Sequence, residues 1–119
     1  PLLIGGSFPT PYMDEAREEL GKIIMETKFN KPRVPIYQCV DALPHMNPEE
    51  IKNNLIQHIT HPVLWTDMTH NMVKDGVNEF YEVGTDDTLQ KIVHRMYPDK
   101  KVTTIWEIPT YNNFNPLNN

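Results

Sequence analysis

The sequence predicts an α/β fold in which a small, mostly parallel β-sheet is flanked by helices. Segments with apolar residues at helical spacing alternate along the chain with short β-prone runs, an order typical of parallel sheets. The 11 prolines lie mostly between these segments, so they separate elements rather than form a linker. The 119 residues are enough for one domain, and an apolar fraction of 39% indicates a globular chain.

The first third of the chain predicts a strand end, a helix and a second strand. Leu2-Leu3-Ile4 is a short apolar run that two glycines close, as where a strand enters a tight loop. Thr10 followed by proline is typical of a helix start, and apolar residues at helical spacing predict a helix over about 11–28. Residues 34–40 predict a strand, in which Pro35 indicates a strand start or an edge position.

Two further helices are expected in the middle of the chain. Asn47 can cap a helix whose first residue is proline, Glu50 stands at the capping-box position, and Pro62 ends the segment. The next helix is expected over about 66–75, with Gly76 as its C-terminal stop. The first of these helices is expected to bury an apolar stripe of Ile51, Leu55, Ile56 and Ile59.

The last third predicts a strand, a helix and a final strand. Residues 77–83 are β-prone, and Asp86 or Asp87 can cap a helix that Pro98 closes. Residues 102–106 predict the last strand. The apolar positions of the helix are Leu89, Ile92, Val93 and Met96.

Charge and composition exclude several classes of function. The net charge of −5 argues against nucleic-acid binding, which normally needs a basic face. No apolar run approaches the roughly 20 residues of a membrane helix, so no membrane association is expected. The single cysteine, Cys39, excludes an intrachain disulfide and fits a reducing compartment. Because the chain starts at Pro1, we expect it to begin inside a longer protein, where a targeting segment can precede it.

Several polar clusters have both a chemical and a structural interpretation. His58 and His61, with Asp67 and His70 further along, could hold a metal, but the spacing lacks the paired pattern of known sites. Hydrogen-bonded histidines at a helix end are the favoured interpretation, and no metal is predicted. Cys39 could be a nucleophile only beside a base, so a structural thiol is favoured.

Two charged clusters of the C-terminal third are expected to be structural. An acidic pair could do acid–base chemistry only if its environments split the two pKa values, so helix capping is favoured. A basic cluster could meet a phosphate or an acidic partner, but a solvated surface is the default interpretation. The acidic residues are Glu79, Glu82, Asp86 and Asp87, and the basic ones are Lys91, Arg95, Lys100 and Lys101.

Four segments together resemble one protein family. Residues 6–13 read Gly-Ser-Phe-Pro-Thr-Pro-Tyr-Met, 29–41 read FNKPRVPIYQCVD, 58–65 read HITHPVLW and 76–89 read GVNEFYEVGTDDTL. They resemble the Gly-Ala-Phe-His-Ser/Thr-Pro-x-Met, FxxPxxPVxxNVD, QLxxPVxW and GVxxFxEVGPGxxL segments of malonyl-CoA:acyl-carrier-protein transacylases. The acyltransferase domains of fatty-acid and polyketide synthases share these segments. Order and spacing agree over roughly residues 1–97.

The resemblance implies ping-pong acyl transfer in fatty-acid synthesis. A serine in a Gly-His-Ser-x-Gly elbow takes malonyl from coenzyme A, a histidine activates the serine, and backbone amides hold the oxyanion. An arginine binds the malonyl carboxylate. Malonyl-CoA is thus the implied substrate, and no covalently bound cofactor is expected. The serine, amides and arginine would lie upstream, so the expected partners are acyl carrier protein and the N-terminal portion of the same domain.

The family fold that the resemblance implies is an α/β-hydrolase-like large subdomain with an inserted ferredoxin-like small subdomain. Residues 1–8 would end the small subdomain with its last strand, and 9–109 would form the C-terminal half of the large one. Residues 110–119 are expected to be a flexible tail. A mitochondrial or other organelle matrix, or the cytoplasm, is the expected location.

The departures from the family pattern fall near the implied site. Pro9 stands where the family has its catalytic histidine, and proline can neither accept nor donate a proton at its side chain. His58 matches a glutamine whose backbone carbonyl orients that histidine, a role that survives a change of side chain. Cys39 replaces an asparagine, and Thr85-Asp86-Asp87 replaces a Pro-Gly-Lys-like turn. The residues expected near the site are Ser7, Phe8, Pro9, Cys39 and His58.

Three hypotheses follow. The leading one is a fragment of a malonyl transacylase that is inactive alone, because the serine elbow is outside the chain and Pro9 replaces the histidine. The second is a non-catalytic acyltransferase-like module that binds a carrier protein or a synthase partner. The third is an unrelated small α/β protein. A structure in which strands 34–40 and 77–83 are not in one parallel sheet would support this third hypothesis. In the first hypothesis His58 or His61 could also replace the missing base.

Overall fold

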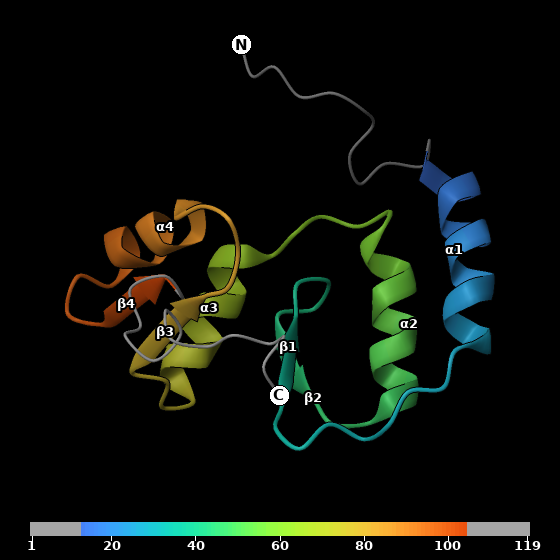
Figure 1. Cartoon of the computed structure of the whole chain (residues 1–119), viewed down its shortest axis with the longest axis horizontal. Helices are drawn as coiled ribbons and strands as arrows, with labels where there is room; N and C mark the ends of the chain where they lie inside the picture. Colours follow the sequence, from blue (N-terminus) through green and yellow to red (C-terminus); the bar gives the residue numbers. More distant parts are fainter. Residues whose placement is uncertain (1–12, 105–119) are drawn as a thin grey trace, which may run out of the picture. The chain divides into compact units, whose positions relative to one another are not determined.

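The computed structural model describes residues 13–104, which fall into two compact units with the boundary after Met72 (Figure 1). The expected strand at 2–4, the Thr10 cap and the tail from 110 lie outside the described residues. No helix among residues 13–104 is both long and apolar enough to cross a membrane.

The first unit contains two packed helices and a short hairpin. Helix α1 (Asp14–Glu26) packs against α2 (Pro48–His58), and α2 packs against strand β1 (Ile36–Gln38). Strand β2 (Leu43–His45) pairs antiparallel with β1, with Ile36 opposite His45. The unit also contains most of α3 (Trp65–Lys74), whose Met68 is buried with 4% of its surface exposed.

The turn of the hairpin depends on Ala42. Its φ of 62° lies in the left-handed region, which costs a residue with a Cβ atom about 1–2 kcal/mol. The Ala42 N–H donates to the Gln38 carbonyl at 2.9 Å, and the Ala42 carbonyl accepts from the Asn71 side chain of α3 at 2.9 Å. The Asp41 carboxylate accepts from the Leu43 N–H at 3.0 Å. These bonds hold a strained turn in which Ala42 is only 3% exposed.

Helix ends in the first unit are stabilised by side chains. The Asn47 side chain accepts from the Glu49 N–H at 2.9 Å, which confirms the predicted cap of α2. Lys52 is buried, and its ammonium donates to the Met25 carbonyl at 3.3 Å while lying 5.3 Å from the Phe29 ring centroid. A cation at the C-terminus of α1 is favoured by the helix dipole.

The second unit is a βαβ arrangement. Strands β3 (Glu79–Glu82) and β4 (Lys101–Thr104) pair in parallel, and α4 (Thr88–Met96) connects them and packs against both. Val93 of α4 is 4% exposed and is the apolar centre of the unit. Gly76 has a φ of 102°, a left-handed conformation suited to the end of α3, as predicted.

The α/β class and the small parallel sheet flanked by a helix are confirmed. Strands β1 and β3 were expected in one sheet, and this is wrong for the part of the chain described. There, β1 pairs with β2 and β3 with β4. The turn at Ala42 returns the chain only a few residues after β1, so β2 takes one edge of β1. Helix α1 ends at Glu26 rather than at about residue 28, and positions 11 and 12 of the predicted helix lie outside the described residues.

Candidate functional site

A pocket of about 340 Å³ lies between β1 and α2 of the first unit. Cys39 and His58, the two expected site residues within the described part of the chain, both line it. The structure therefore brings them together around one cavity. Its other lining residues are Ile36, Tyr37, Gln38, Val40, Ile51, Asn54 and Leu55.

Cys39 has the environment of a structural thiol. Its Sγ donates to the Met68 Sδ at 3.7 Å, and its backbone carbonyl accepts from the Leu64 N–H at 2.9 Å. Burial raises the pKa of the Cys39 thiol above its ordinary value, so the reactive thiolate is disfavoured. This supports the structural interpretation over the nucleophile.

His58 is the last residue of α2, and its position makes its carbonyl available to an outside donor. A carbonyl in a helix normally accepts from the N–H four residues later, but the last turn lacks such partners. The fourth residue after His58 is Pro62, which has no N–H to donate. The local sequence thus leaves this carbonyl free of that bond, as its implied orienting role requires.

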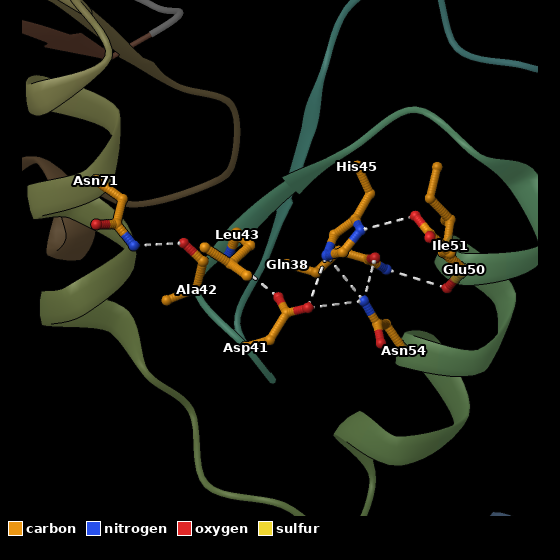
Figure 2. Close-up of polar contacts among 9 residues, drawn as sticks. All are labelled: Gln38, Asp41, Ala42, Leu43, His45, Glu50, Ile51, Asn54 and Asn71. Carbon is orange, nitrogen blue, oxygen red and sulfur yellow. Dashed lines mark hydrogen bonds and ion pairs between the residues drawn. The ribbon is translucent and has the colours of Figure 1, made fainter.

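A polar network joins the hairpin to α2 (Figure 2). Two of its residues, Gln38 and Asn54, line the pocket. His45 Nε2 lies 2.7 Å from Asp41 Oδ2, and His45 Nδ1 lies 3.3 Å from Glu50 Oε2. Burial lowers the pKa of His45, but the hydrogen bonds and charges of Glu50 and Asp41 outweigh it and raise the pKa overall. Glu50 was expected to complete a capping box, yet its carboxylate contacts His45.

Two amide side chains extend this network into the pocket wall. Asn54 Nδ2 donates to Gln38 Oε1 at 3.0 Å and to Asp41 Oδ2 at 3.3 Å. Gln38 Nε2 in turn donates to the Ile51 carbonyl of α2 at 3.1 Å. Gln38 is 8% exposed, so its amide is satisfied inside the protein rather than by bulk water.

The sequence alone did not identify this network. Its residues come from β1, the hairpin turn, β2 and α2, which only the tertiary fold brings together. One local signal existed, because His45 and Glu50 lie on either side of the Asn47 cap. A helix start of that kind turns the first-turn carboxylate back toward the preceding strand.

His61 and Glu82 have structural partners. Residues 13–104 contain no group of three or more His, Cys, Asp or Glu side chains that could hold a metal. The ring of His61 contacts the Gln57 carbonyl at 2.7 Å, at the end of α2. Glu82, rather than Asp87, binds the start of α4: its carboxylate accepts from the Leu89 and Gln90 N–H groups at 3.2 and 2.8 Å.

Three of the four basic candidates make polar contacts. Lys91 pairs with Asp87 at 2.9 Å, Lys101 with Glu79 at 3.8 Å, and Lys100 donates to the Asn78 side chain at 3.0 Å. Asp87 is the N-cap residue of α4, but its side chain makes no capping bond, whereas the Asp86 carboxylate accepts from the Thr88 N–H at 3.4 Å. Ser7, Phe8 and Pro9 lie outside the described residues.

Known proteins with similar sequences are malonyl transacylases, although no protein-family model matches the chain. The polyketide biosynthesis malonyl CoA-acyl carrier protein transacylase PksC of Bacillus subtilis is 35% identical over 99 residues, 83% of this chain and 34% of that protein. The malonyl CoA-acyl carrier protein transacylase of Synechocystis is 28% identical over 112 residues, 94% of this chain and 38% of the relative.

Solved structures show the same similarity. The crystal structure of the Synechocystis malonyl-CoA:ACP transacylase has a TM-score of 0.85 and 27% identity, over 96% of this chain and 39% of that one. An acyl carrier protein S-malonyltransferase from Vibrio cholerae has a TM-score of 0.84 and 26% identity, over 95% of this chain and 37% of that one.

The class that fold and sequence define is the acyltransferase α/β fold. Within it, the chain corresponds to the C-terminal portion of malonyl-CoA:acyl-carrier-protein transacylases. It spans about a third of the length of the curated relatives it matches. The hypothesis of an unrelated α/β protein is therefore set aside, although β1 and β3 belong to separate two-stranded sheets.

Proposed function

We propose that this chain is the C-terminal portion of an enzyme that moves malonyl from coenzyme A to acyl carrier protein. The observation that carries the proposal is the 35% identity to a malonyl transacylase over 83% of the chain. The related proteins are named for malonyl-CoA and acyl carrier protein, so these are the proposed substrate and partner. No covalently bound cofactor is proposed, and a reducing compartment suits the single cysteine.

In this proposal the pocket between β1 and α2 is one wall of the acyl-transfer site. The carbonyl of His58 stands where the family orients its catalytic histidine, and Pro62 leaves that carbonyl without a helical donor. Because Pro9 replaces that histidine in this chain, only Pro9→His gives the carbonyl an imidazole to accept from. Cys39 fills the wall as a protonated thiol. The nucleophilic serine, the oxyanion amides and the arginine come from an N-terminal portion, as the resemblance implies.

The surface of the first unit supports an N-terminal partner. Its buried apolar residues are few, while many large apolar side chains are exposed, and such surfaces usually mark an interface. The exposed side chains are Leu20, Ile23, Met25, Val34, Ile36, Leu43, Leu55 and Val63.

A chimera tests the proposal directly. This chain replaces the matching C-terminal portion of the Synechocystis transacylase, with Pro9 or with Pro9→His, and transfer of labelled malonyl to acyl carrier protein is measured. The chain alone should form no acyl adduct. We expect transfer to be lower by about 10²–10⁴-fold with Pro9 than with Pro9→His, the usual contribution of a positioned general base. Thr10→His is the matched control, because it adds an imidazole one residue away and should restore nothing.

Two outcomes contradict the proposal: a stoichiometric malonyl adduct on the isolated chain, or a folded Pro9→His chimera without activity. The chimera should also bind less of a hydrophobic dye than the isolated chain, since its N-terminal portion covers the exposed apolar side chains.

Pro9 itself favours a second candidate function, a non-catalytic acyltransferase-like module that binds a carrier protein or a synthase partner. The net charge of the chain, −5, disfavours an acidic carrier protein as the partner of such a module. The two functions differ in the full-length gene: a serine elbow and an arginine upstream support the enzyme, and loss of the serine supports the module. A pull-down without captured carrier protein counts against the module.

A further inference from the structure

The geometry around His45 favours a proton on each ring nitrogen. Its side chain is only 13% exposed, and its two nitrogens face two different carboxylates. Asp41 lies 2.7 Å from Nε2, and Glu50 lies 3.3 Å from Nδ1. A carboxylate only accepts hydrogen bonds, so each contact is a hydrogen bond only when the facing nitrogen carries a hydrogen. A neutral imidazole has one such hydrogen and leaves one contact unmade.

The side-chain amide of Asn54 does not change the number of hydrogens that the His45 ring needs. Asn54 Nδ2 lies 3.1 Å from His45 Nε2, so in a neutral ring it could donate to that nitrogen. The 2.7 Å contact between Nε2 and Asp41 Oδ2, however, would be a repulsion between lone pairs unless Nε2 carried a hydrogen. Gln38 Oε1 at 3.0 Å and Asp41 Oδ2 at 3.3 Å can accept the two Asn54 hydrogens instead. Nε2 of His45 is therefore left to donate to Asp41, the shortest contact in the network.

We propose that His45, as the doubly protonated imidazolium, is a proton-operated latch that fastens the β1–β2 hairpin to the first turns of α2 and thereby positions Gln38 and Asn54 in the wall of the pocket. Asp41 contacts both the His45 ring and the Asn54 amide, and Asn54 in turn donates to Gln38 (Figure 2). The His45 ring therefore helps to position both amides. Loss of one proton breaks one of the two carboxylate contacts and loosens that wall.

The direction of the pH response follows from the surrounding charges. The ionisable groups that face the ring are Asp41 from the hairpin turn and Glu50 from α2, while the amides from β1 and α2 are uncharged. Burial lowers the pKa of His45, but the two carboxylates raise it by more. The latch is therefore fully closed below the ordinary value of 6.5 and opens as the pH rises through the higher value of the folded protein.

An NMR titration of the full chain tests the latch without relying on acyl transfer. We expect the His45 ring to titrate above pH 6.5, and the side-chain amide signals of Gln38 and Asn54 to shift with the same midpoint. A midpoint at or below 6.5, or amide signals that do not follow the ring, would overturn the proposal. Because the wild-type protein is used, the result does not depend on whether a variant folds.

Variants sharpen the test through stability. Each unit of difference between the folded and unfolded pKa changes the unfolding constant about tenfold across the titration. His45→Gln should abolish this loss of stability above pH 6.5, and Glu50→Gln should shift its midpoint downward. His61→Gln, an exposed ring bonded to the Gln57 carbonyl, is the control and should retain the wild-type pH profile. A His45→Gln profile identical to the wild type contradicts the latch.

Discussion

The two units use polar side chains in different ways. In the first unit, Gln38, His45 and Asn54 are linked to one another between a hairpin and a helix, and two of them line a pocket. In the second unit, Glu82 binds the start of a helix and Lys101 pairs with Glu79 across a parallel strand pair. Polar residues that converge on a cavity can serve a site, whereas those at helix ends and strand edges serve the fold. Only the first arrangement is a candidate for function.

The largest expected effect tests the hairpin turn of the first unit. Ala42→Val places a β-branched side chain at a φ of 62° in a position only 3% exposed. Strain and overpacking together should cost about 2–5 kcal/mol of unfolding free energy, measured by urea denaturation. Ala42→Gly is the control: it removes the left-handed strain and one buried methyl group, so we expect a change within about 1 kcal/mol. A Val variant as stable as the Gly variant would show that the turn is not strained.

A smaller effect is expected from the apolar centre of the second unit. Val93→Ala removes two methyl groups from a side chain that is 4% exposed and should cost about 1–3 kcal/mol. Ile92→Ala is the matched control, since Ile92 is one residue away on the same helix and 37% exposed. Hydrogen exchange of the β3 and β4 backbone amides measures the loss of stability in both variants. Equal losses in the two variants would contradict the placement of Val93 at the centre.

The contrast between residues at helix ends and residues brought together by the tertiary fold explains what could be predicted from the sequence. Helices α2 and α3 were predicted because their ends depend on local residues, Asn47 at one start and Gly76 at one end. Strand β2 was missed because Leu43-Pro44-His45 contains a proline and is too short to show alternation. The burial of Lys52 could not be predicted, because its ammonium needs a carbonyl and a ring from a distant segment.

The candidate site was predicted only in part, for a similar reason. Cys39 and His58 were identified through a resemblance carried by motifs, and the fold places both at one pocket. The latch residues belong to no motif and depend on register: Ile36 opposite His45 fixes where the imidazole lies relative to α2. Sequence patterns report local periodicity, whereas this network depends on the pairing of two strands and one helix.

The cap of α4 should have an effect of about 1 kcal/mol. Glu82→Gln keeps the shape of the side chain but removes the charge that accepts from two N–H groups at 3.2 and 2.8 Å. Glu79→Gln is the control on the same strand, where the carboxylate meets Lys101 at the exposed surface. Thermal unfolding should show a larger loss of stability for Glu82→Gln than for Glu79→Gln. The reverse order would mean that the surface pair, and not the cap, stabilises the second unit.

The smallest effect is expected for the exposed ion pair between Lys91 and Asp87, although its two charged atoms are close together. Lys91 and Asp87 are 2.9 Å apart, but their side chains are 70% and 48% exposed. Water screens such a pair, and holding two long side chains in one geometry costs entropy, so Lys91→Ala should change the unfolding free energy by less than about 0.5 kcal/mol. Lys52→Met, at a buried lysine that bonds to the Met25 carbonyl, should cost more, although that contact is longer, at 3.3 Å. Urea unfolding of both variants tests whether burial, and not distance, ranks the ion contacts of this protein.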